Sequence, residues 1–229
     1  FQVNGAEVTL AALMDGLRQA CANISQSGLM KELRLAKQKI SLLAACADIG
    51  GKWPLERVTR CLSDLADAAV ALALNHILKT AHASGEIVLP VPEEPQKSSG
   101  IIILGMGKLG AHELNYSSDI DLIVFYAGGR LAYRGRQSEQ HFMNRLCRDL
   151  VHILETRDAN GYVFRTDLRL RPDPASTPPA VSVDAALYYY ESVGQNWERA
   201  AMIKARAIAG DEKQAEDFRR RLVPFIWRR

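Results

Sequence analysis

The residues with the clearest chemical potential lie in GMGKLGAHELNYSSDIDLIVFY, residues 105–126. Asp119 and Asp121 stand two positions apart at the start of an apolar run. Residues i and i+2 of a strand point to the same face, so we expect these carboxylates to project side by side. Parallel carboxylates repel each other, and a cation beside them removes that cost. Mg²⁺ suits such oxygens and leaves positions for phosphate, whereas the plain alternative is a solvated strand start.

A second polar stripe lies in VFRTDLRLRP, residues 163–172. Strict alternation would place Asp167 among arginines on one face of a strand and apolar residues on the other. Beside the first strand, Asp167 would complete a three-carboxylate cluster for two metal ions roughly 4 Å apart, as in-line phosphoryl displacement requires. Arg169 and Arg171 would then neutralise phosphate charge. The alternative is an exposed strand face with ion pairs.

The glycines at 105, 107 and 110 match the dinucleotide-binding pattern G-x-G-x-x-G. That fold also requires a full-length first helix and an acid at the end of the second strand. Here the predicted helix, GKLGAHELN at 107–115, is short, and the second strand ends in IVFYAGG. The Walker pattern G-x-x-x-x-G-K-[ST] does not fit either. We therefore regard a dinucleotide site as a distant alternative.

A phosphate-binding turn explains the same glycines better. Gly105 and Gly107 allow close approach of the backbone to a phosphate, and the N-terminus of the following helix offers free N–H groups to an anion. Ser117 and Ser118 precede the aspartates and are positioned to donate hydrogen bonds to phosphate oxygens. Lys108 is a further candidate phosphate ligand, although a first-turn lysine is equally consistent with simple solvation.

Two more basic candidates lie in WERAAMIKARAIAG, residues 197–210, which we predict to be helical. Its apolar residues form a stripe, and Lys204 and Arg206 are polar members of the same segment. One interpretation is that Lys204 or Arg206 reaches the phosphates. The alternative is an ordinary solvated helix face.

The elements that must position these residues change character along the chain. Apolar spacing predicts helices over 7–83, and a segment rich in Pro, Ser and Gly follows at 83–100. The rest alternates between strands and helices, which we expect at these ranges: strands 101–104, 119–126 and 161–172, and helices 107–115, 137–157 and 184–222. The fold class is thus α+β, a mixed sheet with flanking helices preceded by a helical subdomain. We place the subdomain at 1–97 and the catalytic domain, with a truncated helical C-terminal tail, at 98–229.

Composition excludes several classes of protein. The 229 residues carry a net charge of only +3, so bulk charge does not favour nucleic-acid binding. We find no apolar run near the ~20 residues of a membrane span and predict no membrane partner. The four cysteines form no C-x-x-C pair, which argues against zinc knuckles or a disulfide framework and fits a cytoplasmic protein. The first residue is Phe1, and both ends suggest a fragment.

With these residues in view, the chain resembles the nucleotidyltransferase superfamily that includes DNA polymerase β and kanamycin nucleotidyltransferase. Over roughly residues 30–222 it resembles more closely the bifunctional glutamine synthetase adenylyltransferase/adenylyl-removing enzymes, on the segments GMGKLGAHELNYSSDIDLIVFY, GYVFRTDLRLRP and NWERAAMIKARAIAGD. The sequences ELN and WERAAMIKARAIAGD are similar to the N-terminal, adenylyl-removing domain of that family.

The resemblance implies specific roles. Asp119 and Asp121 match the metal-binding pair of the family, Asp167 matches its third carboxylate, and Gly105 and Gly107 match its nucleotide loop. The implied reaction is phosphorolysis, in which inorganic phosphate removes AMP from adenylyl-tyrosine of glutamine synthetase and gives ADP, with Mg²⁺, two ions, as cofactor.

The implied partners are adenylylated glutamine synthetase and, through the full-length enzyme, PII-type regulatory proteins. The alternatives are the forward reaction, ATP-dependent adenylylation of glutamine synthetase, and a non-catalytic nucleotide-sensing module.

Overall fold

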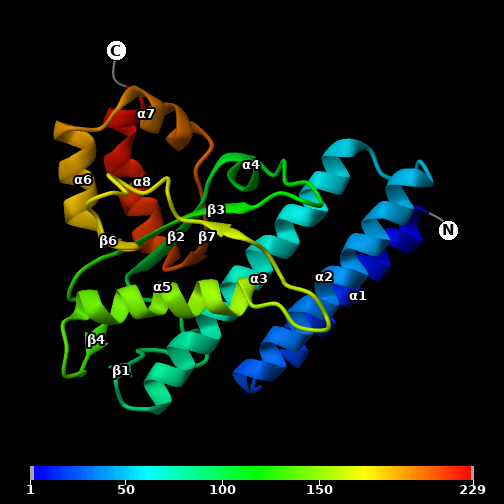
Figure 1. Ribbon diagram of the computed structural model, residues 1–229, viewed down its shortest axis with the longest axis horizontal. Helices are drawn as coiled ribbons and strands as arrows, with labels where there is room; N and C mark the ends of the chain where they lie inside the picture. Colours follow the sequence, from blue (N-terminus) through cyan, green and yellow to red (C-terminus); the bar gives the residue numbers. More distant parts are fainter. Residues whose placement is uncertain (1–2, 228–229) are drawn as a thin grey trace.

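The computed structural model describes residues 3–227. Three long helices open the chain: α1 (Val3–Ala20), α2 (Gln26–Ile49) and α3 (Leu55–Ala83). In Figure 1, α3 runs between the sheet on one side and the pair α1 and α2 on the other. The helix α3 contacts α2, α5 (Glu139–Glu155) and the strand β7 (Arg206–Gly210). It is therefore the element that the helical block and the sheet share.

Local sequence explains where these helices begin and end. The hydroxyl of Ser25 accepts a hydrogen bond from the backbone N–H of Gly28 and caps α2, which satisfies one of the first-turn donors. Pro54 precedes α3, where its fixed φ angle suits a helix start. The alanines of α3 at positions 66, 69 and 73 are fully buried. Small side chains there allow neighbouring elements to approach this helix closely.

Four strands form a path with the order β5–β3–β2–β7. The strand β6 also pairs with β3, at residues 124–126, further along β3 than β5 does. Their bounds are β2 (Ile101–Gly105), β3 (Ile120–Tyr126), β5 (Thr166–Asp167) and β6 (Ala180–Ser182). The strand β2 is antiparallel to β3 and to β7, whereas β5 and β6 are both parallel to β3. The sheet is thus mixed, and the predicted α+β class is confirmed.

The two central strands are buried on both faces. Ile101 and Ile103 of β2 join a core cluster with α3 and α5, while Ile102 and Leu104 join a second cluster with α6 (Val183–Ser192) and α8 (Glu212–Ile226). This division explains the continuous apolar run at 101–104, because a strand covered on both faces has no polar side. Figure 1 shows α6 and α8 beside each other near the C-terminus, together with α7 (Asn196–Ile203).

The remaining elements are small. The helix α4 (Gly107–Gly110) follows β2, and β1 (Ile87–Val88) pairs with β4 (Ala132–Tyr133) in a separate ribbon. The first core cluster contains residues of α1, α2 and α3 as well as residues of β2, β3 and α5. The hydrophobic core is therefore continuous across residue 97, and the division into two domains there stays a prediction.

Three sequence expectations about elements were wrong in extent. The strand predicted at 161–172 is only Thr166–Asp167, because Val163 and Phe164 are both buried rather than alternating. The helix predicted at 107–115 ends at Gly110, and His112 has a φ of 59°, a conformation that does not continue a helix.

The helix predicted at 184–222 is divided into α6, α7 and α8, and β7 lies between the last two. The segment 206–210 alternates small and larger residues. It forms the strand β7, because backbone pairing with β2 stabilises it more than the helical pattern of its sequence would.

Within residues 3–227 one helix, α3, is long and apolar enough to cross a membrane by length and composition. It has 29 residues, and 61% of its most apolar stretch of 18 residues is buried inside the protein. The core helix of a globular protein passes the same test, so this finding is weak evidence for a membrane span.

A buried cation fastens α2 to the loop after α5. The Arg34 side chain is only 3% exposed and its Nη1 lies 2.6 Å from Oδ2 of Asp158, which is 43% exposed. We expect Asp158→Asn to lower the free energy of unfolding by about 1–3 kcal/mol, because a buried charge loses its ionic partner. Chemical denaturation checks this value.

The matched control is Asp15→Asn. Asp15 pairs with Arg18 on α1, and both side chains are more than half exposed. Exposed pairs contribute little, so we expect a change within ~0.5 kcal/mol. Equal effects of the two substitutions would contradict the role of Arg34 burial.

Candidate active site

Parallel pairing of β3 with β5 brings the predicted carboxylates together. Asp121 lies opposite Asp167 in the register, and Asp119 directly precedes β3. The predicted proximity of Asp167 to the D-x-D pair is therefore confirmed. Burial raises the pKa of Asp121, and the negative charges of Asp167 and Asp119 raise it further. Three like charges thus gather at one end of the sheet.

Two arginines offset part of this charge. Arg165 Nε forms an ion pair with Asp119, and its Nη2 donates to the Ser117 carbonyl at 2.9 Å. Arg169 Nη2 lies 2.6 Å from Oδ2 of Asp167, and its hydrogen bonds lower the pKa of Asp167. Alternation along residues 163–172 puts Arg165 on the same polar stripe as Asp167, but it indicates no contact of this side chain with the D-x-D pair. Only the structure shows that it contacts the D-x-D pair.

Asp121 is the carboxylate without such an offset. Within residues 3–227 it has no ion-pair partner within 4.0 Å, and the charges of Arg169 and Lys108 lower its pKa only partly against burial and the two acids. Carboxylate oxygens of this kind are hard donors, which fit Mg²⁺. The donor chemistry of the three aspartates therefore fits the metal that the sequence predicts.

A tighter group of potential ligands lies elsewhere. Asp64, Asp67 and His112 have ligand atoms that all lie within 4.8 Å of one another. In the described part of the chain this is the one group of three His, Cys, Asp or Glu side chains that meets this distance. Both of its carboxylates already bind arginines, Asp64 to Arg60 and Asp67 to Arg206. Because the protein itself compensates these charges, this group has less need of a metal than Asp121 has.

The glycine turn lies directly against the carboxylates. Gly107 begins α4 with a φ of 52°, and a Cβ added there would lie 3.1 Å from Oδ2 of Asp121. The backbone N–H of Met106 donates to the Asp121 carbonyl at 2.9 Å. Lys108 follows on the exposed side of the turn. A ligand bound to Asp121 would thus meet the backbone at Gly107 without a side chain between them.

Neighbouring atoms fill the space around the other two glycines, so both allow close packing, and the predicted role of Gly105 in phosphate binding stays a prediction. A Cβ at Gly105 would meet Ile208 at 2.9 Å and Leu109 at 3.0 Å, and one at Gly110 would lie 1.9 Å from the Lys204 carbonyl oxygen. Gly105 therefore lets β2 lie close to α4 and β7, and Gly110 lets α4 lie against the backbone of Lys204 at the end of α7. The helix α4 has only four residues, so its dipole is much weaker than that of the helix predicted at 107–115.

The serines and Arg171 are engaged within loops. Ser118 Oγ donates to Oδ1 of Asn115 at 2.8 Å, and the Ser117 N–H donates to the same oxygen at 3.1 Å. Asn115, which the sequence argument missed, thus organises the turn before the D-x-D pair, as short polar side chains commonly do. The Arg171 side chain donates to the backbone carbonyls of Leu168, Pro174 and Thr177.

The two C-terminal cations also have partners of their own. Lys204 Nζ lies 2.8 Å from Oε2 of Glu113. Arg206 lies on β7 rather than on a helix, and its Nη1 is 2.6 Å from Oδ2 of Asp67. The structure thus engages both side chains with acids outside the carboxylate trio, and their predicted contact with phosphate stays a prediction.

The close contact at Gly110 generates a stability prediction. We expect Gly110→Ala to lower the free energy of unfolding by at least ~1–3 kcal/mol, because backbone atoms rather than a flexible side chain occupy the space of the new methyl group. Thermal or chemical denaturation measures the change.

Gly16 provides the control, because it lies inside α1 and nothing lies within 4 Å of an added Cβ. Gly16→Ala should raise stability by ~0.5–1 kcal/mol, since Ala has the higher helix propensity. A neutral effect at Gly110 would show that α4 can move away from the backbone of Lys204.

Comparison with known proteins agrees with this geometry. The GlnE family, described as glutamate-ammonia ligase adenylyltransferase, matches residues 3–221. A bifunctional glutamine synthetase adenylyltransferase/adenylyl-removing enzyme of Mesorhizobium japonicum is 51% identical over 225 residues, covering 97% of this chain and 23% of the relative. The enzyme of the same name from Agrobacterium fabrum is 51% identical over 204 residues, covering 89% of this chain and 21% of the relative.

The chain thus spans less than a quarter of the length of these two relatives. The match nevertheless includes the helical block, the glycine turn and both aspartate-bearing strands. On the extent of the family match and the identity to these relatives, the chain belongs to the glutamate-ammonia ligase adenylyltransferase family.

Proposed function

We propose that this chain is a metal-dependent nucleotidyltransferase that removes AMP from adenylyl-tyrosine of glutamine synthetase. The observation that carries the proposal is the β3–β5 register, which places Asp121 beside Asp167, with Asp119 two residues before Asp121. The relatives named above carry an adenylyltransferase/adenylyl-removing name, which supports transfer of an adenylyl group on this substrate.

In the proposed reaction an oxygen of inorganic phosphate attacks the phosphorus of the AMP–tyrosine phosphodiester. The bond from phosphorus to the tyrosine oxygen breaks, ADP forms, and the phenolate takes up a proton. Two Mg²⁺ held by Asp119, Asp121 and Asp167 would supply charge stabilisation for the phosphoryl oxygens. Phosphate is already anionic, so no general base is required. A phenol with a pKa near ~10 is a tolerable leaving group.

The chain's own residues bind and orient the reactants. Gly107 permits close approach of the nucleotide phosphate to the backbone beside Asp121. Arg169, whose side chain is 83% exposed, and Arg165 are free to turn from the acids toward the phosphates, where their charge would stabilise the transition state. Lys108 and the exposed Ser117 complete the proposed phosphate surroundings.

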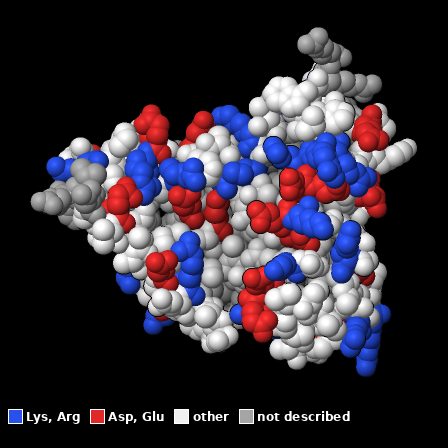
Figure 2. Space-filling view, turned by 180° about the vertical axis from the view of Figure 1, so that it is seen from behind, with Lys and Arg blue, Asp and Glu red and all other residues white. Residues whose placement is uncertain are grey.

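We propose adenylylated glutamine synthetase as the protein partner in the cytoplasm, with PII-type proteins acting through the full-length enzyme. This part of the proposal rests on the family resemblance and on the names of the relatives. On the face drawn in Figure 2, basic and acidic side chains lie beside one another. A broad basic stripe, the usual mark of a nucleic-acid site, is not visible on that face.

The second candidate is the forward reaction, ATP-dependent adenylylation of glutamine synthetase. Its support is the name of the relatives, which covers both activities. The adenylyl-removing direction rests on the resemblance of ELN and WERAAMIKARAIAGD to one of the two family domains. Formation of ADP from phosphate and the adenylylated substrate, against pyrophosphate from ATP and the unmodified substrate, separates the two.

Substitution of the D-x-D pair tests the site. We expect Asp119→Asn to lower the rate of ADP formation by a factor of at least ~100, because the proposed Mg²⁺ site loses one of its carboxylate ligands. Asp119 is half exposed, so the fold should survive, as circular dichroism can verify. The assay contains this chain, adenylylated glutamine synthetase, Mg²⁺ and phosphate.

Asp15→Asn on the exposed surface of α1 is the control and should leave the rate unchanged. Full activity of the Asp119→Asn variant would refute the metal assignment. Pyrophosphate release from ATP by the unmodified chain, without any ADP formation, would favour the forward reaction.

A further inference from the structure

The turn that carries Gly107 is too short to hold its own position. The helix α4 comprises four residues, with backbone hydrogen bonds from Gly110 to Met106 and from Ala111 to Gly107. Isolated helices of this length are unstable in water, because nucleation outweighs the few bonds that form. Contacts from outside α4 must therefore fix the turn relative to Asp121.

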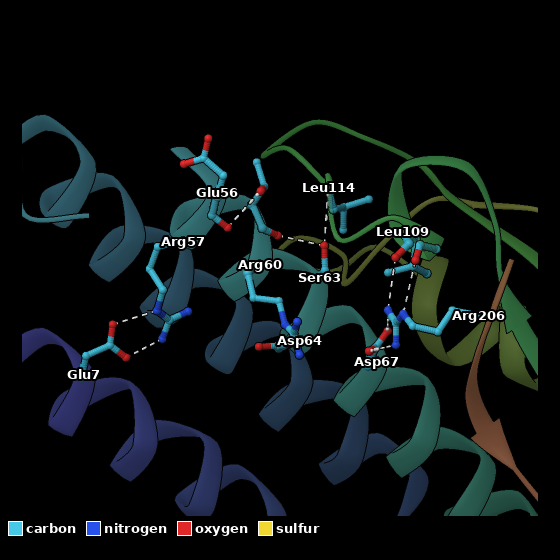
Figure 3. A network of polar contacts seen from close by, with 12 residues as sticks. Glu7, Glu56, Arg57, Arg60, Ser63, Asp64, Asp67, Leu109, Leu114 and Arg206 are labelled. Atoms are coloured by element: carbon cyan, nitrogen blue, oxygen red, sulfur yellow. Dashed lines mark hydrogen bonds and ion pairs between the residues drawn. The ribbon is translucent and has the colours of Figure 1, made fainter. Parts of the chain in front are cut away.

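The helical block supplies one such contact at Ser63. In Figure 3, Ser63 of α3 points toward Leu114 in the loop after α4, and the backbone N–H of Leu114 donates to Ser63 Oγ at 3.3 Å. Both residues are fully buried. The Ser63 hydroxyl in turn donates to the Thr59 carbonyl at 2.8 Å. A buried N–H without this acceptor would be left unsatisfied, so the loop is held to α3 at this point.

A second contact runs through Asp67, one turn further along α3. Its two carboxylate oxygens accept hydrogen bonds from Nη1 and Nη2 of Arg206 at 2.6 and 3.0 Å, and Nη2 also donates to the Leu109 carbonyl at 3.1 Å. Figure 3 shows the guanidinium between the acid and the end of α4. The planar fork of arginine suits such a bridge, because one rigid group meets both partners.

The same arginine is anchored in the sheet. Arg206 lies opposite Gly105 in the β2–β7 register, immediately before the turn. The side chains of the Arg206–Asp67 pair are about three-quarters buried, so solvent screens this pair less than the exposed pairs of α1. The residues after Gly107 are thus held to α3 through Leu109 and Leu114, and Gly105, before it, pairs with β7.

We infer that Ser63, Asp67 and Arg206 are positioning residues that hold the glycine turn against the carboxylate trio. The inference rests on the proposed function, and it gives the helical block a role in that site. Through these contacts α3 sets the distance between the backbone at Gly107 and the Asp121 carboxylate, where a nucleotide phosphate would lie.

Hydrogen exchange provides a test that does not depend on activity. In the Asp67→Asn variant, exchange of the Gly110 and Ala111 amides should accelerate by about 10-fold or more, because local opening of the turn becomes easier. Exchange in the core strands β2 and β3 should stay as in the unmodified chain. Arg206→Lys keeps the charge but loses the fork, and it should give the same local change.

Kinetics then link the turn to the reaction. A displacement of ~1 Å at a reacting centre costs on the order of 100-fold in rate, so we expect the Asp67→Asn variant to form ADP about 10- to 100-fold more slowly. The matched control is Glu56→Gln on the same helix. Glu56 is exposed in the first turn of α3, eleven residues before Asp67, and its substitution should alter neither exchange nor rate.

The outcomes are distinct. Unchanged exchange at Gly110 and Ala111 in both variants would overturn the inference, and so would acceleration spread evenly over the whole chain. Local acceleration with an unchanged rate of ADP formation would also overturn it. If the unmodified chain forms no ADP, the proposed function fails, and the exchange comparison by itself decides whether these residues hold the turn.

Discussion

Electrostatic repulsion among the carboxylates of Asp119, Asp121 and Asp167 is the constraint on which the rest of the site depends. Parallel pairing of β3 with β5 forces two of them into neighbouring positions. Arg165 and Arg169 compensate Asp119 and Asp167, and burial leaves Asp121 with a raised pKa. A fold tolerates such a group only where surrounding packing holds it in place.

That packing comes from the two central strands. The side chains of β2 and β3 divide between two hydrophobic clusters, one with α3 and α5 and one with α6 and α8. Strands covered on both faces resist slippage, because a shift by one residue would exchange every side chain between the clusters. The register that brings Asp121 to Asp167 is therefore supported by the burial of every residue of β3 except Asp121 itself. The sheet itself thus holds the carboxylates, whereas the glycine turn beside them is held by contacts with α3 and β7.

Several sequence predictions held because they depended on local periodicity or on neighbouring positions in one strand. The apolar run at 101–104 predicted a buried strand, and the D-x-D spacing predicted two carboxylates near each other. The family resemblance was also visible from contiguous segments. The strand predicted at 161–172 was too long, because the buried pair Val163 and Phe164 breaks the alternation that its polar residues suggest.

The sequence by itself thus determined the class of fold and the family, and it predicted the three acids that the sheet brings together. Tertiary structure alone decided the partners of the basic residues: Arg165 meets Asp119, and Arg206 meets Asp67 across 139 positions of sequence. It also decided that Gly105 and Gly110 serve packing, whereas Gly107 faces the acids. Charge and side-chain volume at one position do not specify which distant segment lies opposite, since the pairing of whole strands and helices sets it.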